Sequence, residues 1–266
     1  MCVSSAAADF RGTTLYAGRR DHPEHGPIEV LGYQNTAVNL SDGPNAMLLH
    51  LPAADGVGFV PVGRSGDVLA RMRAATEPAL DTAAMDWMSN DEARFSIFEH
   101  DVYTVVLAAD PMSVPAALHR VPPRKRPSLR PELFTFYADV FPLHTIALCC
   151  FDNAEAQIAK PLLLRYRPID PDLVHLPGID SHTGEAPDLD ADVDTDHWLV
   201  FGTDDPDWGA HYDRPPGMRH ELRSYLPASV RGLAVEGRHP NGDFVLTLDD
   251  LRAGAVHNVR RMPPDH

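Results

Sequence analysis

The run His144-Thr145-Ile146-Ala147-Leu148-Cys149-Cys150-Phe151 carries the clearest information about the fold. Almost every side chain in it is apolar, and several are β-branched or aromatic, which is typical of a short strand that is buried on both faces. Such a strand must lie inside a sheet that other elements cover on each side. The run therefore predicts a central strand in a layered fold.

Further strand-like runs outnumber the helical ones. The 25 prolines divide the chain into short segments, which favours strands and loops over long helices. Apolar residues at helical spacing predict amphipathic helices from Asp67 to about Leu80 and from Pro131 to about Val140. The pattern predicts a strand-rich α+β fold, with further strands at Ala46–Leu51, Val102–Leu107, Pro161–Tyr166, His197–Phe201 and Asp243–Leu248.

Length and composition bound the domain organisation. A chain of 266 residues with a hydrophobic fraction of 44% can bury a large core. We expect a single domain over residues 1–266. The basic, proline-rich stretch Val121–Pro127, inside the region 121–130, fits either an internal linker or a loop within that domain.

The net charge of −15 argues against nucleic acid and against an anionic membrane surface as partners. No apolar run reaches the roughly 18 residues that a membrane-spanning helix needs, and no signal peptide is indicated. Three cysteines do not make a disulfide framework, so we expect a reducing, cytoplasmic setting. The 14 histidines lack HExxH or CxxC spacing, and we expect neither a metal nor a cofactor.

Cys2 is the main candidate for catalysis. If Met1 is removed, this residue carries both a thiol and a free α-amine, whose pKa of roughly 8 suits it to act as the base that activates the thiol. That pairing defines an N-terminal nucleophile. The alternative is structural, because a free cysteine in a strand-forming N-terminus behaves as a small hydrophobic residue.

The first 21 residues read as a strand over Met1–Ser5, a turn at Phe10–Gly12 and a strand over Thr13–Asp21. With Gly18-Arg19 and Asp21 at the end of the second strand, this stretch resembles the opening hairpin of cysteine-type N-terminal-nucleophile hydrolases. The choloylglycine hydrolase and penicillin V acylase group is the most similar. One residue fewer separates Arg19 from Asp21 than in that group.

The resemblance implies a layered αββα sandwich and a C–N bond hydrolase that acts on a small, non-peptide amide without a cofactor. It implies that Cys2 attacks the carbonyl, that Arg19 orients the nucleophile, and that Asp21 accepts a hydrogen bond from the α-amine. Asn35 and Asn153 are candidates for substrate binding, because amide side chains can hold an oxyanion. Each of these asparagines also fits an ordinary turn or surface position.

A second set of reactive residues, His144, Cys150 and Asp152, shares one face of the predicted strand. His144 and Cys150 are too far apart along a strand for a direct hydrogen bond, so the run is interpreted as a buried strand. Trp198 and Trp208, with nearby histidines, are candidates for lining a pocket.

The tract Asp188-Leu189-Asp190-Ala191-Asp192-Val193-Asp194-Thr195-Asp196 has an acid at every second position. Repulsion between these carboxylates favours a loop, full solvation or a bound cation. The tract lacks the glycine and glutamate of a calcium loop, so we interpret it as a solvated loop that influences partner choice. The alternative function is therefore a non-catalytic α+β protein with an acidic partner-binding face, in which Cys2 is a packing residue.

Overall fold

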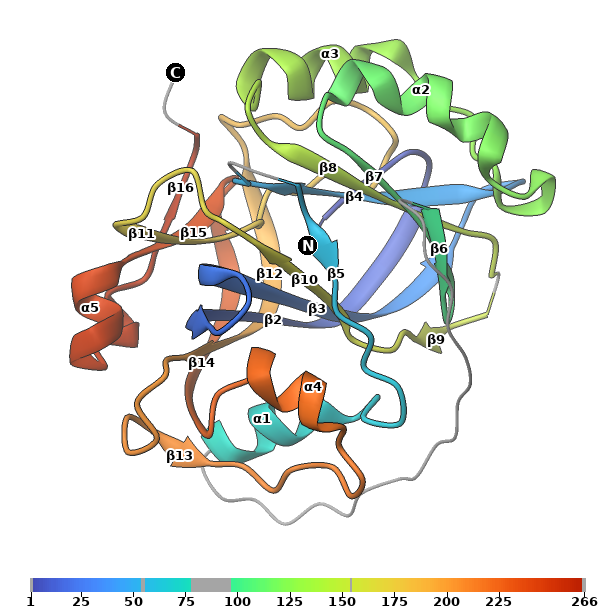
Figure 1. Cartoon of the computed structure of the whole chain (residues 1–266). Coiled ribbons are helices and arrows are strands. Elements are labelled where there is room, and N and C mark those ends of the chain that lie inside the picture. The colour runs from blue at the N-terminus through green and yellow to red at the C-terminus, as the bar shows by residue number, and fades with distance from the viewer. Residues whose placement is uncertain (1, 54–55, 78–96, 154, 265–266) are drawn as a thin grey trace.

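The computed structural model describes residues 2–53, 56–77, 97–153 and 155–264. Two sheets lie face to face in it, and helices cover the outer face of each (Figure 1). The order of the layers is helix, sheet, sheet, helix. A smaller sheet and one further helix lie at the side of this sandwich.

In the described part of the chain, the first sheet has five strands in the order β1-β4-β8-β7-β6, and every neighbouring pair is antiparallel. The run that opened the sequence analysis forms its central strand, β8, in which all seven residues are buried. The bounds of the strands are β1 Val3–Ser4, β4 Asn45–Leu51, β6 Ile97–His100, β7 Tyr103–Ala108 and β8 Thr145–Phe151.

The second sheet has the order β13-β14-β12-β2-β3-β10-β5, with β9 paired to β3. All pairs are antiparallel except β12 with β2, which run parallel. Its strands are β2 Ala8–His22, β3 Gly26–Asn39, β5 Gly58–Phe59, β9 Gln157–Ile158, β10 Leu162–Tyr166, β12 Asp192–Gly202, β13 Ala210–His211 and β14 Ser229–Pro240.

The small sheet contains β11 Leu173–Leu176, β15 Asp243–Thr247 and β16 Arg260–Met262, in that order. The α-helices are α1 Val68–Thr76, α2 Val114–Ala117, α3 Pro131–Val140, α4 His220–Tyr225 and α5 Leu248–Ala253. The described ranges also contain four short 3-10 helices, which are η1 Pro111–Ser113, η2 Leu118–Arg120, η3 Pro123–Lys125 and η4 Val256–Asn258.

Among the residues that the structure describes, three apolar clusters hold these layers together. The largest lies between the two sheets, where Leu15 and Tyr33 of one sheet meet Met47 and Cys149 of the other. A second cluster joins α3 to the outer face of the five-stranded sheet, and a third joins α1 and α4 to the outer face of the larger sheet. Each sheet is therefore buried on both faces, as the uninterrupted apolar runs predicted.

The strand-rich α+β fold is confirmed, and the six predicted strands appear as β4, β7, β8, β10, the second half of β12, and β15. The predicted helices appear as α1 and α3. Residues 78–80, at the end of the first predicted helix, lie outside the described residues. The stretch 121–130 contains η3 and contributes Val121 to the cluster beneath α3.

The predicted N-terminal hairpin is wrong. Val3 and Ser4 pair with β4 in the five-stranded sheet, whereas β2 belongs to the other sheet. The predicted turn at Phe10–Gly12 lies inside β2. Gly12 has a φ of +58°, and the register of β2 against β3 shifts between Arg11 and Thr14. A glycine with positive φ at a register shift is a β-bulge, which lets the strand continue where the sequence suggested a turn.

Candidate functional site

Cys2 lies inside the molecule, between the two main sheets. It is 2% exposed and belongs to the same apolar cluster as Leu15, Met47 and Cys149. The Cys2 carbonyl accepts a hydrogen bond from the Ser181 amide at 3.3 Å, which fixes the start of β1 against the segment before β12. These surroundings are those of a packing residue in the apolar core, which is the structural alternative for Cys2.

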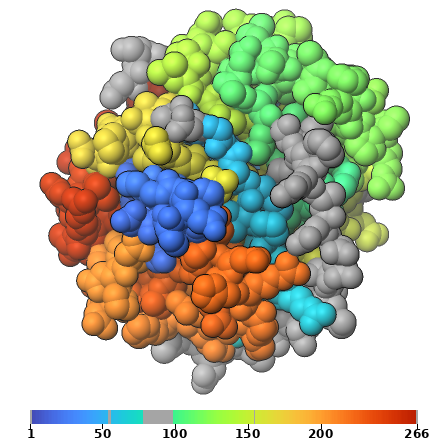
Figure 2. Space-filling view, in the orientation of Figure 1, coloured from blue at the N-terminus to red at the C-terminus, as the bar shows by residue number. Residues whose placement is uncertain are grey.

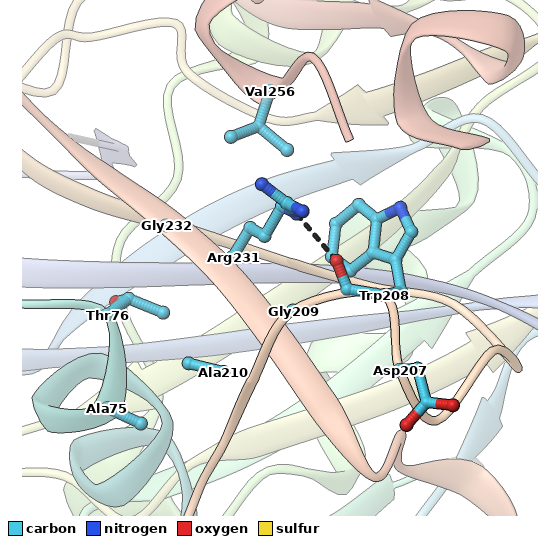
Figure 3. Close-up of a pocket in the computed structure, with 9 residues that line it drawn as sticks. All are labelled: Ala75, Thr76, Asp207, Trp208, Gly209, Ala210, Arg231, Gly232 and Val256. Atoms are coloured by element: carbon cyan, nitrogen blue, oxygen red, sulfur yellow. Dashed lines mark hydrogen bonds between the residues drawn. The ribbon is translucent and has the colours of Figure 1, made fainter. Parts of the chain in front are cut away.

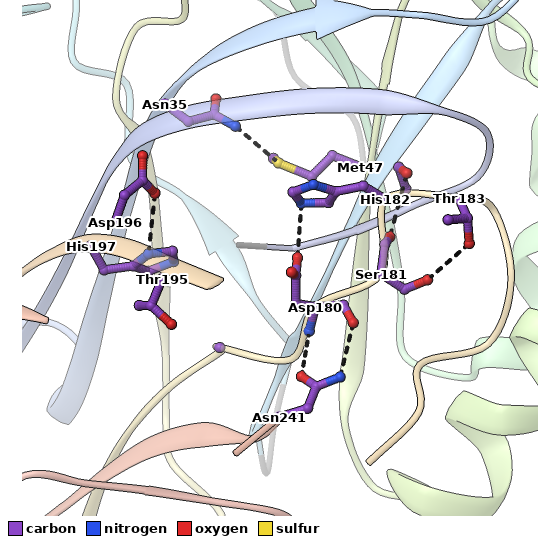
Figure 4. Close-up of polar contacts among 12 residues, drawn as sticks. Asn35, Met47, Asp180, Ser181, His182, Thr183, Thr195, Asp196, His197 and Asn241 are labelled. Atoms are coloured by element: carbon purple, nitrogen blue, oxygen red, sulfur yellow. Dashed lines mark hydrogen bonds and ion pairs between the residues drawn. The ribbon is translucent and has the colours of Figure 1, made fainter. Parts of the chain in front are cut away.

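A small polar network surrounds the thiol. Its side chain interacts with Tyr33 and with His182, and His182 forms an ion pair with Asp180 at 2.8 Å. The ion pair is drawn in Figure 4. A thiol, an imidazole and a carboxylate are the parts of a thiol nucleophile. Here the sulfur belongs to the apolar cluster between the two sheets, where Cys2 is 2% exposed.

Arg19 and Asp21 lie away from Cys2. Leu15 pairs with Tyr33 beside the thiol, and Arg19 and Asp21 lie four and six residues further along β2, which corresponds to about 13 and 20 Å. Arg19 donates from Nε to the buried Glu29 carboxylate at 2.8 Å and from its other nitrogens to the carbonyls of residues 170, 171 and 173. Its contacts are those of a structural ion pair.

The Asp21 side chain is exposed, and its backbone amide donates to the Asp204 carboxylate at 2.7 Å. The tip of the β2–β3 hairpin, blue at the centre of Figure 2, lies between yellow and orange segments that follow it much later in the chain. The predicted roles of Arg19 and Asp21 beside the nucleophile are therefore corrected. The long, continuous β2 strand carries both residues away from Cys2.

Of the two candidate asparagines, only Asn35 lies near the thiol. Asn35 is buried, accepts a hydrogen bond from the Tyr103 hydroxyl at 2.9 Å and donates to the Tyr33 hydroxyl at 3.3 Å. Asn153 donates to the carbonyls of Ala37 and Glu155 at 2.8 and 2.9 Å, and so closes a turn at the far end of β3. The structure does not bring the two asparagines together.

All three cysteines should resist alkylation in the folded protein. Cys149 and Cys150 are fully buried like Cys2, and burial raises the pKa of Cys149 well above its usual range and that of Cys150 to about 12. A catalytic Cys2 would be the first of the three to react. We now expect iodoacetamide to label none of the three before unfolding and all three in urea, as read by intact mass. Rapid labelling of native Cys2 would instead show an accessible nucleophile.

The ion pair between His182 and Asp180 should make stability fall at alkaline pH. Burial alone would lower the pKa of His182, but contacts with Asp180 and Cys2 outweigh it and raise that pKa to about 9. An unfolded histidine titrates near about pH 6.5, so this stabilisation is complete below that pH and is lost as the pH rises through about 9.

Urea unfolding at a series of pH values should show a loss of about 2–3 kcal/mol over that window. Asp180→Asn should remove most of this decline, because His182 then loses the carboxylate that favours its charged form. An equal decline in the variant would rule out this ion pair as its source.

A surface pocket of about 410 Å³ lies beside β14, where Trp208, Asp207 and Arg231 contribute its largest side chains (Figure 3). Arg231 donates from Nε to the Trp208 carbonyl at 2.7 Å and stacks over the indole ring. Trp208 thus lines a pocket as the sequence suggested. Trp198 instead packs beside α1, where its indole nitrogen donates to Thr76 at 2.9 Å.

The acidic tract is half strand and half loop. Asp192, Asp194 and Asp196 form the start of β12 and are exposed, while Thr195 and His197 between and after them are buried. The prediction of a loop is therefore wrong for this half. Pairing with β14 and the burial of Thr195 and His197 stabilise the strand. The three aspartates alternate with these residues and face solvent, which limits the repulsion between their carboxylates.

Asp196 also accepts a hydrogen bond from the Gly12 amide at 2.8 Å and lies 3.6 Å from Nδ1 of His197 (Figure 4). Across the ladder, Glu236 pairs with Asp196 and Arg238 with Asp194. On this face of the ladder, Asp192, Asp194, Asp196 and Glu236 are thus accompanied by one arginine, Arg238. We use "acidic surface" below for Asp188, Asp190, Asp192, Asp194 and Asp196.

No protein-family model and no curated protein matches this sequence. Solved structures of baculovirus P35 match this chain over most of its length. One crystal structure has a TM-score of 0.47 and 13% identity, covering 94% of this chain and 92% of that chain. A mutated baculovirus P35 after caspase cleavage gives a TM-score of 0.45 and 10% identity, covering 90% and 98% of the two chains.

None of these comparisons supports the assignment to the hydrolases with an N-terminal nucleophile, and that assignment is withdrawn. The small amide substrate was inferred from that resemblance alone, and it is not carried further. Within the parts of the chain that the structure describes, no helix has the length and apolar character to cross a bilayer.

Proposed function

We propose that this chain is a non-catalytic α+β protein that binds a basic protein partner through its acidic surface. The observation that carries the proposal is the regular row of exposed carboxylates at the start of β12. Alternate residues of a strand are about 6.6–6.8 Å apart, so the strand presents Asp192, Asp194 and Asp196 as a rigid row.

The electrostatics of this row favour a cationic partner. Like charges held side by side repel one another, and lysine or arginine side chains from a partner would relieve that repulsion while forming new ion pairs. The net charge of −15 extends the attraction beyond the row and would speed association at low salt. The burial of Cys2 supports the non-catalytic part of the proposal, since the candidate nucleophile serves as a core residue.

The proposal is tested by measuring how tightly an oligolysine peptide binds the unmodified protein and two variants of equal charge. The first variant replaces Asp192, Asp194 and Asp196 by asparagine. The control replaces three exposed acids elsewhere, as Glu132→Gln, Asp139→Asn and Asp152→Asn. Three exposed ion pairs at about 0.5 kcal/mol each amount to about 1.5 kcal/mol, so the first variant should bind about tenfold more weakly.

The control should bind nearly as tightly as the unmodified protein, and rising salt should weaken all binding. Equal weakening by the two variants would mean that only net charge matters, and would contradict a defined binding surface.

A further inference from the structure

Four side chains that are remote in sequence meet where the five-stranded sheet adjoins the small sheet. His50 comes from β4, His144 from the residue before β8, His175 from β11 and Asp243 from the first position of β15. His50 and Asp243 are buried, while the His144 and His175 residues are partly exposed. Each comes from a different element, so the cluster exists only in the folded chain.

The Asp243 carboxylate is the centre of this cluster. Its Oδ2 atom lies 2.7 Å from Nε2 of His50 and 2.9 Å from Nε2 of His175. Its Oδ1 atom accepts hydrogen bonds from the backbone amides of Gly178 and Ile179 at 2.7 and 3.2 Å. One oxygen is thus anchored by the backbone, and the other is aimed at two imidazoles.

His144 completes a triangle of imidazole rings. Its ring centre is 5.6 Å from that of His50 and 5.7 Å from that of His175, and the last two are 5.9 Å apart. Nδ1 of His144 and Nδ1 of His175 are buried, and neither has a hydrogen-bond partner among the described residues.

We propose that His50, His144, His175 and Asp243 form a binding site for a zinc-type transition-metal ion that joins the five-stranded sheet to the small sheet. Three imidazoles and one carboxylate are a donor set that suits Zn²⁺. The donor atoms of His50, His175 and Asp243 all lie within 4.8 Å of one another.

The donor distances of His50, His175 and Asp243 agree with this assignment after a small expansion, and His144 is assigned to it through the spacing of its ring from the other two. Ligand atoms on a tetrahedral zinc ion are about 3.3 Å apart, and imidazoles that share the ion have ring centres about 5 Å apart. On metal binding, the distances from Oδ2 of Asp243 to the Nε2 atoms of His50 and His175 would increase by about half an ångström. The distances between the centres of the imidazole rings would decrease by a similar amount. The backbone amides on Oδ1 supply the outer hydrogen bonds that orient a ligating carboxylate.

Metal binding replaces hydrogen bonds that the cluster now makes. Each Nε2 atom that donates to Asp243 must give up its proton to offer a lone pair, so the neutral ring keeps its proton on Nδ1. The partial exposure of His144 and His175 provides a route of entry for the ion. Such a site would stabilise the folded state, because the four ligands come together only there.

The test uses the full chain after treatment with a chelator and dialysis. Titration with Co²⁺, followed by visible absorption, should show one equivalent bound with the strong bands of a tetrahedral site. Zn²⁺ should displace the Co²⁺ and raise the melting temperature by several degrees. A folded protein that gives neither the bands nor the thermal shift at stoichiometric metal would overturn the proposal.

Single substitutions then test the ligands. His144→Asn is the most informative, because His144 makes no bond to Asp243 and its loss should leave the fold intact. We expect it and His175→Asn to weaken Co²⁺ binding about 100-fold or more, since loss of even an outer partner costs about 10–100-fold. His257→Asn and His220→Asn remove exposed histidines and should bind as the unmodified protein does. Unchanged binding by folded His144→Asn and His175→Asn proteins would contradict the assignment.

Discussion

Asp243→Ala is expected to lower the free energy of unfolding by about 3–5 kcal/mol, which is the cost of breaking a buried charged pair by removing one partner. Asp243 is 2% exposed, and its carboxylate serves His50, His175 and two backbone amides. Alanine would leave all four donors without their acceptor. Burial by itself would raise the pKa of Asp243, but the two histidines hold that pKa well below its usual range.

Urea unfolding of chelator-treated protein measures this effect without a contribution from bound metal. Asp249→Ala is the control, because Asp249 is exposed and its loss should change stability by less than about 0.5 kcal/mol. If Asp243→Ala changed stability as little as the control does, the buried cluster would not contribute to holding the small sheet in place.

Glu29→Ala is expected to destabilise the protein by a similar amount, about 3 kcal/mol or more. Glu29 is fully buried and accepts hydrogen bonds from Arg19 at 2.8 Å and from the Tyr166 hydroxyl at 2.8 Å. Its removal would leave a mostly buried guanidinium without its counter-charge and a buried phenol without its acceptor. Glu29→Gln should cost less, because it retains an acceptor oxygen.

The exposed Glu24→Ala serves as the control for this measurement. Glu29→Ala and Arg19→Ala should both lower the urea midpoint, because the two residues stabilise the same ion pair. If Glu29→Ala lowered the stability and Arg19→Ala did not, the structural role assigned to Arg19 would be contradicted.

The sequence was sufficient to predict the layered core. Runs such as 144–151 and 161–166 are apolar at consecutive positions, and only a strand covered on both sides satisfies that pattern. The amphipathic spacing in 131–140 likewise predicted α3 and its buried face, which includes Leu133 and Tyr137. These elements depend on patterns within a few residues, and local periodicity therefore predicts them.

The N-terminal pairing was not predictable in this way. Val3 pairs with Leu48, 45 residues away, and nothing local distinguishes this partner from the nearer β2 strand. Gly12 was interpreted as a turn because glycine permits positive φ, but a bulge uses the same freedom. Since Arg19 and Asp21 were placed beside Cys2 only through that expected hairpin, the candidate catalytic site fell with it.

The histidine cluster and the acidic strand illustrate two further limits. His50, His144, His175 and Asp243 have no short spacing to detect, because the contact between two sheets brings them together. In the acidic tract, charge repulsion predicted a loop. The segment is nevertheless a strand, because it pairs with β14 and buries the side chains of Thr195 and His197. The carboxylates remain solvated on the outer face, which limits their repulsion.

The central claim is that the acidic surface is a binding surface for a basic partner, and amide hydrogen exchange with and without an oligolysine peptide tests it most directly. We predict that the peptide slows exchange within Asp188–Asp196 and in the paired residues Glu236–Pro240 of β14, and leaves α3 and the five-stranded sheet unchanged. Slowed exchange spread evenly over the chain, or absent from Asp188–Asp196, would contradict the claim.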